Sequence, residues 1–172
     1  MTKRITVLVG PPCSGKSSYL KDFESDFVIS SDRIVEILCR QHMLEYHEYF
    51  LLPKLHKIRI AHDKIFYKLV QHSKRFQHIV WDLTNLTQES RARIFVHYPG
   101  ASFTAIQFDT PCGKNEVLKR ELLQRNLERS RTQGKYIEES ILKSMVDKYE
   151  RVNEDEGFSE ILKLKVINIT NK

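Results

Sequence analysis

The chain alternates short apolar runs with longer stretches in which apolar residues recur every three or four positions. Runs rich in β-branched residues predict strands, and the wider spacing predicts helices between them. Five strands are predicted, at residues 5–10, 27–30, 78–83, 103–109 and 162–169. Helices are predicted at residues 16–23, 32–50, 54–74, 87–97, 114–131 and 137–152. This alternation predicts an α/β fold, a parallel sheet with helices on both faces.

Length and composition indicate one ordinary globular domain. The chain has 172 residues, of which 41% are hydrophobic and 29% charged, and we expect a single domain over residues 1–172. No apolar run approaches the roughly 18 to 20 residues that a membrane span needs. The N-terminal apolar run lacks a cleavage-like site, and the three cysteines are scattered without metal-binding spacing. These features favour the cytoplasm.

The stretch GPPCSGKS after the first predicted strand fits the pattern G-x-x-x-x-G-K-[ST] and opens a predicted helix. In this pattern successive backbone N–H groups and the helix N-terminus cradle phosphates. Lys16 is predicted to reach the β- and γ-phosphates, and the Ser17 hydroxyl to ligate magnesium. We therefore expect ATP, or another nucleoside triphosphate, and Mg²⁺. The predicted nucleotide-binding residues of the loop are Gly10, Pro11, Pro12, Cys13, Ser14, Gly15, Lys16, Ser17 and Ser18.

Two carboxylates lie at the carboxyl ends of predicted strands, the edge at which parallel sheets bind ligands. Asp32 follows VISS and is placed to take the proton from an attacking hydroxyl. The alternative is a helix N-cap, for which this residue and the two serines before it are suited. Asp82 ends IVWD, where a Walker B acid supports magnesium, here through water. Thr84 and Asn85 follow and are candidate substrate-binding residues.

A basic helix running into Gly134 is a candidate lid, at residues 119–137. Kinases need a mobile, positively charged cover that expels water and neutralises charge on the transferred phosphoryl group. Arg125 and Arg129 are four residues apart and therefore share a helix face. We expect the first to act in catalysis and the second to bind the nucleotide. The alternative is a solvated helix end with pairs such as Glu121 with Arg125.

The segments GPPCSGKSS, ISSD, VWDLTNLTQESR, LLQRNLERS and EGFSEI occur in an order and at spacings that resemble the 5'-hydroxyl polynucleotide kinase family. The resemblance covers most of the chain and implies transfer of the ATP γ-phosphate to a 5'-hydroxyl end of DNA or RNA. Carried over by position, Asp32 resembles the general base, Asp82 the second essential acid and Arg125 the lid arginine. Lys16 and Ser17 match the residues that bind phosphates and magnesium.

Two positions depart from the family pattern. The family usually has glycine where Cys13 stands, so the loop is strained here if that position needs a positive φ angle. Members often place an arginine three residues after the base, where it holds the phosphate next to the accepting hydroxyl, and this chain has Val35 there. Arg33 and Arg40 are candidates to replace that arginine, but neither occupies the matching position.

The charge balance favours an anionic partner. The formal net charge is +6, and Lys57, Lys64 and Lys68 fall on a side of the predicted helix 54–74 that is distinct from its apolar stripe. A nucleic-acid strand could lie along this basic stripe, and binding would then weaken steeply with salt. The alternative is an ordinary solvated helix face.

The sequence therefore predicts a P-loop kinase fold of about five strands and an ATP-dependent kinase of 5'-hydroxyl ends of RNA or DNA. One alternative is a small-molecule P-loop kinase with a nucleoside, sugar or nucleotide-sugar acceptor, because the same loop, acid and lid serve those reactions. A second is a nucleotide-dependent nucleic-acid-binding switch without transfer. Neither a DxDGT phosphatase nor a KxDG ligase signature occurs, so the chain would act alone or with separate phosphatase or ligase partners in nucleic acid repair.

Overall fold

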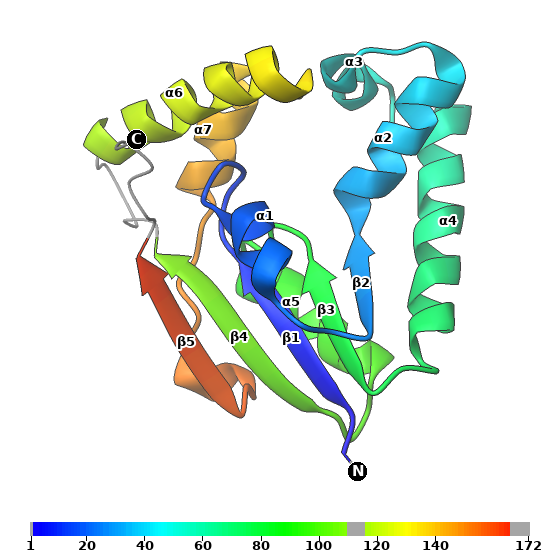
Figure 1. Ribbon diagram of the computed structural model, residues 1–172, viewed down its shortest axis with the longest axis vertical. Coiled ribbons are helices and arrows are strands. Elements are labelled where there is room, and N and C mark those ends of the chain that lie inside the picture. Colours follow the sequence, from blue (N-terminus) through cyan, green and yellow to red (C-terminus); the bar gives the residue numbers. More distant parts are fainter. Residues whose placement is uncertain (1, 110–115, 166–172) are drawn as a thin grey trace.

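A five-stranded sheet forms the centre of the molecule (Figure 1), for which a computed structural model describes residues 2–109 and 116–165. Its strands are β1 (Arg4–Val9), β2 (Phe27–Ser30), β3 (His78–Asp82), β4 (Ser102–Asp109) and β5 (Glu160–Lys165). The spatial order is β2-β3-β1-β4-β5, and each pair of neighbours is parallel. The predicted α/β fold with a parallel sheet is confirmed.

Helices connect the strands. They are α1 (Lys16–Tyr19), α2 (Ser31–His42), α3 (Tyr46–Leu51), α4 (Lys57–Ser73), α5 (Gln88–His97), α6 (Glu116–Gln133) and α7 (Glu139–Asp147). Short 3-10 turns follow at Leu20–Asp22 and Glu154–Glu156. Within the described residues, no helix is long and apolar enough to span a bilayer.

The strands are apolar on both sides because helices cover both faces of the sheet. Val7 and Val9 of β1 belong to the same buried cluster as Ile94 of α5. Leu8, between them, points to the other face and joins a second cluster, against which Tyr19 of α1 packs. A third cluster joins α2, α3, α4, α6 and α7, so the helices at the carboxyl end of the sheet are packed against one another.

The helix predicted at residues 32–50 is two helices, and the structure corrects the sequence here. Met43 takes a left-handed backbone with φ 53°, which ends α2. A capping box formed by Glu45 and Glu48 then starts α3. Methionine is not a typical residue for a left-handed helix end, so the apolar spacing gave no sign of the break. The bend turns α3 toward the carboxyl end of the sheet.

Other boundaries differ by a few residues. The first predicted helix is α1 followed by a 3-10 turn, α4 begins at Lys57, and α7 ends at Asp147. β5 starts at Glu160, two residues earlier than predicted, and the predicted strand residues 166–169 lie outside the described residues. So do residues 114–115 of the helix expected at 114–131. None of these shifts alters the order of the elements.

Candidate active site

The loop between β1 and α1 is compact and built around glycines. Gly15 has φ 102°, a left-handed conformation that favours glycine, at the N-cap of α1. A Cβ atom at Gly10 would lie 2.9 Å from the Ser14 Oγ and 3.1 Å from the Phe108 Cβ. Both glycines of the phosphate-loop pattern are therefore required by the backbone path. The side chains that follow, those of Ser17 and Ser18, are exposed at the start of α1.

Cys13 has φ 66°, in the left-handed region where a side chain costs about 1 kcal/mol or more. The strain expected if this position needed a positive φ angle is therefore present. Its carbonyl oxygen accepts a hydrogen bond of 3.3 Å from Nη1 of Arg125, which ties the loop to α6. Burial raises the pKa of the Cys13 thiol, while nearby Arg129 opposes the rise.

Lys16 lies within the curl of this loop. Its Nζ donates to the carbonyl oxygens of Gly10 and Pro11, both at 2.7 Å, and its side chain is almost fully buried. Burial lowers the pKa of Lys16 to about 8, against the opposing charges of Asp82 and Asp32. A buried ammonium group at the start of a helix is suited to an anionic ligand, which would restore the full positive charge.

Three features of the loop fit a bound phosphate and a magnesium ion. The Oγ of Ser14 is buried and has no hydrogen-bond partner among the described residues. Lys16 supplies the cation, and the hydroxyl of Ser17 together with the carboxylate of Asp82 supplies the oxygen ligands that magnesium prefers. No group of three or more His, Cys, Asp or Glu side chains gathers within residues 2–109 and 116–165.

Asp82 and Asp32 lie at adjacent strand ends. Asp82 ends β3, where it is opposite Ser30 of β2 in the parallel register, and Asp32 lies in the first turn of α2. Burial raises the pKa of Asp82, while Lys16 opposes the rise and the Ser30 side chain donates a hydrogen bond to the carboxylate. The two carboxylates therefore face one region from adjacent elements.

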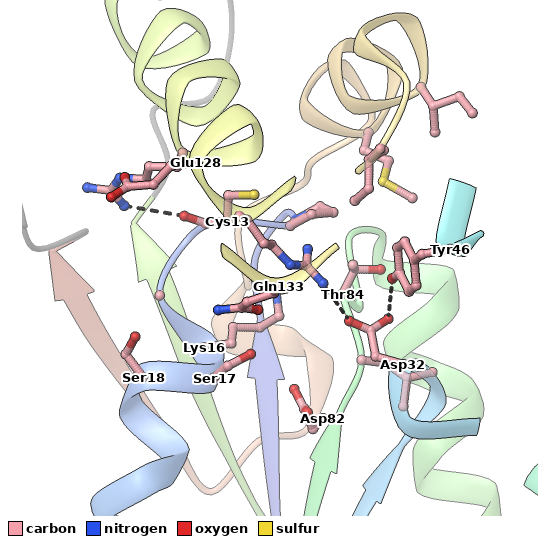
Figure 2. Close-up of a pocket in the computed structure, with 18 of the residues that line it drawn as sticks. Cys13, Lys16, Ser17, Ser18, Asp32, Tyr46, Asp82, Thr84, Glu128 and Gln133 are labelled. Carbon is pink, nitrogen blue, oxygen red and sulfur yellow. Dashed lines mark hydrogen bonds and ion pairs between the residues drawn. The ribbon is translucent and has the colours of Figure 1, made fainter. Parts of the chain in front are cut away.

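Asp32 does not cap α2, because the N-cap is Ser30 and no side-chain capping bond is present there. Its Oδ1 accepts a hydrogen bond of 3.2 Å from the hydroxyl of Tyr46, and its Oδ2 lies 3.4 Å from Nη2 of Arg129. The Arg129 guanidinium also lies 5.6 Å from the centre of the Tyr46 ring. Figure 2 shows Tyr46 directed at Asp32. Sequence reasoning missed Tyr46 because α3 was predicted as part of a longer helix.

The lid candidate, α6, is joined to the rest of the site by polar contacts. The buried side chain of Asn126 donates to the carbonyl oxygen of Ile137 at 2.7 Å and accepts from its N–H at 3.2 Å. The Lys135 ammonium pairs with Glu36 of α2. The turn after α6 is thereby connected both to α6 itself and to the helix that carries Asp32.

A cavity of about 600 Å³ brings most of the predicted site residues together. Those that line it are Pro12, Cys13, Gly15, Lys16, Ser17, Ser18, Asp32, Asp82, Thr84, Arg125 and Arg129. Gly10, Pro11 and Ser14 belong to the same loop without lining the cavity. Figure 2 shows the loop residues facing Asp32 and Asp82 across this cavity.

Other predicted site residues lie away from the cavity. Asn85 has φ 48° and uses its side-chain amide to donate to the Leu8 carbonyl oxygen at 2.7 Å. Arg33 is exposed outside the lining, although its charge acts to lower the pKa of Asp82. The predicted basic stripe lies on the exposed surface of α4 and does not line the cavity; its members are Lys57, Lys64 and Lys68.

A buried arginine on α5 holds the segment that carries Thr84. Nε and Nη2 of Arg91 contact the two carboxylate oxygens of Glu156 at 2.6 and 2.7 Å. Its Nη1 also donates to the carbonyl oxygens of Asn85 and Glu150, at 3.0 and 3.1 Å. Both residues lie in segments that carry the family resemblance, VWDLTNLTQESR and EGFSEI. Sequence reasoning missed the pair because its members are 65 residues apart and nothing in either segment indicates the partner.

Comparison with known proteins identifies the same architecture. Residues 5–152 match the AAA domain family. The structure is similar to a fungal RNA kinase (18% identity, TM-score 0.59, 99% of this chain and 78% of that one). It is also similar to Chaetomium thermophilum Kti12 in complex with ADP-AlF3 (18%, 0.59, 94% and 88%).

A third similar structure belongs to the PezAT toxin-antitoxin system of Streptococcus pneumoniae (16% identity, TM-score 0.60, 96% of this chain and 68% of that one). Among curated protein sequences no match is found. Because these identities are below 25%, the similarities establish the fold alone, which is that of P-loop kinases.

Proposed function

We propose that this chain, which belongs to the AAA domain family, is an ATP-dependent kinase that phosphorylates 5'-hydroxyl ends of RNA or DNA. The observation that carries the proposal is that one cavity joins the phosphate loop, the carboxylate of Asp32 and two lid arginines. A nucleotide-binding loop alone serves many reactions, whereas a carboxylate opposite it suits a hydroxyl acceptor. The similar fungal structure is an RNA kinase, which supports this acceptor class.

The donor end of the site consists of the phosphate loop and the lid. Lys16 and the N-terminus of α1 bind the β- and γ-phosphates, and Arg125 reaches the loop from α6 at the Cys13 carbonyl oxygen. Ser17, and Asp82 through water, would hold magnesium, which would neutralise phosphate charge. The cations of the protein are thus gathered where charge develops during transfer.

Asp32 is the residue that activates the acceptor. Its side chain is about half exposed (53%) to the cavity, so an incoming hydroxyl can reach it. Tyr46 occupies one carboxylate oxygen, and Arg129 lies 3.4 Å from the other. That distance is longer than an ordinary charge-assisted hydrogen bond. The guanidinium can therefore turn from Asp32 to the transferred phosphoryl group and leave that oxygen to accept the hydroxyl proton.

A nucleic-acid strand longer than its terminal nucleotide would extend beyond the cavity. Lys57, Lys64 and Lys68 are exposed on α4, a helix that lies next to α2 (Figure 1). They and Arg33 are proposed contacts for phosphates farther along the strand, and Thr84, which lines the cavity, is a proposed contact for the acceptor end. We treat residues 119–137 as the lid of a single domain that acts alone or with separate ligase or phosphatase partners.

Transfer of a labelled γ-phosphate tests this function. With ATP and magnesium, we expect label on a 5'-hydroxyl oligonucleotide and none on the same oligonucleotide that already bears a 5'-phosphate. Asp32→Asn should lower the turnover number by about 10²- to 10⁴-fold, the usual contribution of a positioned base. ATP binding by this variant should be retained, because the phosphate loop is intact.

The matched control is Asp22→Asn, which removes an exposed carboxylate from the 3-10 turn outside the cavity. It should transfer phosphate at the unaltered rate. Label on neither oligonucleotide, with ATP still bound, would refute the polynucleotide acceptor, and a panel of nucleosides and sugars would then identify the small-molecule acceptor. Full activity of Asp32→Asn would refute the assignment of the base.

A further inference from the structure

One end of the cavity is apolar, although its other end is strongly charged. Five apolar side chains line it, and we call them the apolar wall: Tyr46, Phe50, Ile137, Ile141 and Met145. The first two come from α3, Ile141 and Met145 come from α7, and Ile137 lies two residues before α7. None of the five carries a charge, so this wall cannot bind the phosphates of the donor.

The apolar face of α7 contributes both to the buried helix cluster and to the cavity lining. Leu142 and Val146 of α7 are buried, with 1% and 4% of their surface exposed, in the cluster that joins α7 to the other helices. Ile141 and Met145 lie one residue before each of these and are only partly buried. Ile141 also packs against that cluster, so these four positions form one broad apolar face. The part of this face that lines the cavity indicates a ligand with an apolar surface.

The wall begins at the acceptor carboxylate itself. The Tyr46 hydroxyl donates to Asp32, and the Tyr46 and Phe50 rings meet at 5.2 Å, inclined at 65°. His47 on the same helix lies 6.4 Å from Tyr136, beside Ile137. The two halves of the wall are therefore adjacent. A group bound on it would lie next to the hydroxyl that Asp32 activates.

We propose that the apolar wall binds the base of the 5'-terminal nucleoside of the acceptor; this inference rests on the function proposed above. A nucleobase has two flat apolar faces, and it stacks well on tyrosine, phenylalanine and methionine side chains. Its ribose carries the 5'-hydroxyl, so a base on the wall directs that hydroxyl toward Asp32. A sugar or a phosphate without a base would leave its polar groups against an uncharged apolar surface.

A base subsite also accounts for the missing arginine. Val35, which stands three residues after Asp32, is 2% exposed and belongs to the buried cluster of α2, α3 and α7. Its position faces the core, not the cavity. The terminal nucleoside is therefore held by its base, and phosphates farther along the strand contribute contacts outside the cavity.

The experiment compares two acceptors that differ only in one base. Both are 5'-hydroxyl oligonucleotides of the same length, and one has an abasic 5'-terminal residue that keeps its ribose, its 5'-hydroxyl and its phosphate. Loss of one stacked base should lower kcat/KM by about tenfold or more. Equal kcat/KM for the two acceptors would overturn the inference while leaving the kinase function intact.

A variant links this effect to the wall. In Ile141→Ala/Met145→Ala, the KM for the normal acceptor should rise about tenfold while the KM for ATP is unchanged. The KM for the abasic acceptor should rise little further, because that acceptor has no base for the wall to bind. Ser144→Ala, an exposed position on α7 between them, is the matched control and should behave as the unaltered protein. A thermal unfolding scan verifies that both variants fold.

Equal losses on the normal and abasic acceptors would overturn the assignment of the wall, because the variant would then act on something other than the base. Transfer to neither acceptor by the unaltered protein, with ATP bound, would refute the kinase function and this inference together. The two failures are thus distinguished by whether the unaltered protein labels the normal oligonucleotide.

Discussion

Two arginine–carboxylate pairs in this molecule differ in burial and in contact geometry. Arg91 and Glu156 are 0% and 2% exposed and meet at two points, at 2.6 and 2.7 Å. Arg129 and Asp32 make one contact of 3.4 Å, and Asp32 is 53% exposed. The first pair has its hydrogen bonds satisfied and cannot move without leaving buried charges. The second is a single long contact in which the Asp32 carboxylate is open to solvent and Arg129 is 17% exposed, so the carboxylate is free to exchange partners during a reaction.

Position in the fold explains the difference. Arg91 and Glu156 connect α5 to the 3-10 turn before β5 and hold the segment after β3 through backbone carbonyl groups. Arg129 and Asp32 connect the lid candidate α6 to the start of α2 across the cavity. The Arg91–Glu156 pair holds the segment that carries Thr84. The Arg129–Asp32 pair lies between α6, which we propose moves as a lid, and α2, which stays in place.

The largest expected effect comes from breaking the buried pair. Glu156→Ala leaves the Arg91 guanidinium buried without its carboxylate, and removing one partner of such a pair costs about 3–5 kcal/mol. The free energy of unfolding, measured by denaturant titration, should fall by that amount. Glu89→Ala on α5 removes the partner of Arg93 in a pair that is 74% and 78% exposed, and it should change stability by less than about 1 kcal/mol. Similar losses for both would contradict the distinction.

Breaking the loose pair should affect the rate instead of stability. Arg129→Ala should lower the turnover number by about 10²- to 10³-fold, the usual loss when one donor to a developing charge is removed. Its contact with Asp32 is long and one partner is exposed, so the free energy of unfolding should change by less than about 1 kcal/mol. A destabilisation as large as that of Glu156→Ala would show that the pair is structural.

The sequence analysis proposed both members of the loose pair, Asp32 and Arg129, and neither member of the buried pair, and distance along the chain explains the difference. The phosphate loop, the strands and the two strand-end carboxylates are encoded by residues close together in sequence, so Asp32 could be proposed directly. Arg91 was missed because its partners Glu150 and Glu156 are 59 and 65 residues away. Asn85 was predicted to bind substrate because it follows Asp82, but its amide is used by the Leu8 carbonyl oxygen.

Tyr46 shows a second limit of local reasoning. Its hydroxyl reaches Asp32 only because Met43 breaks the helix predicted at residues 32–50. A side chain on a continuous helix would have pointed elsewhere, and apolar spacing does not encode such a break. The apolar wall was also invisible in the sequence, because half-buried and buried positions of α7 have the same residue types. Their difference arises from tertiary packing around the cavity.

Removing the Tyr46 hydroxyl should have a smaller effect, because Asp32 then loses a neutral hydrogen-bond donor and keeps its contact with Arg129. Tyr46→Phe removes only the hydroxyl that donates to Oδ1. One hydrogen bond of this kind is worth a factor of about two to ten, so kcat should fall by that amount with the KM for ATP unchanged. Tyr49→Phe, also buried on α3, is the control and should leave kcat unaltered. A fall in kcat of equal size in both variants would assign the effect to packing of α3.

The smallest expected effect concerns Lys16, a cation that belongs to neither of the two arginine–carboxylate pairs. Burial lowers the pKa of Lys16 to about 8 from an ordinary value of 10.5, so the folded protein loses this proton at a pH where the unfolded chain keeps it. This group therefore makes the folded state more stable as pH rises from about 8 toward 10.5. Bound phosphates would raise the pKa again, and ATP binding at about pH 8.5 should take up a fraction of a proton per molecule.

Calorimetric titrations of ATP in buffers of different ionisation enthalpy measure that proton uptake. Lys16→Arg is the matched variant, because an arginine stays charged throughout this pH range and its binding should take up no proton from this position. Equal uptake by both proteins would place the titrating group elsewhere. Proton uptake by the unaltered protein alone would show that the buried Lys16 ammonium contacts the phosphates. Transfer from the donor end of the cavity to the acceptor end requires this contact.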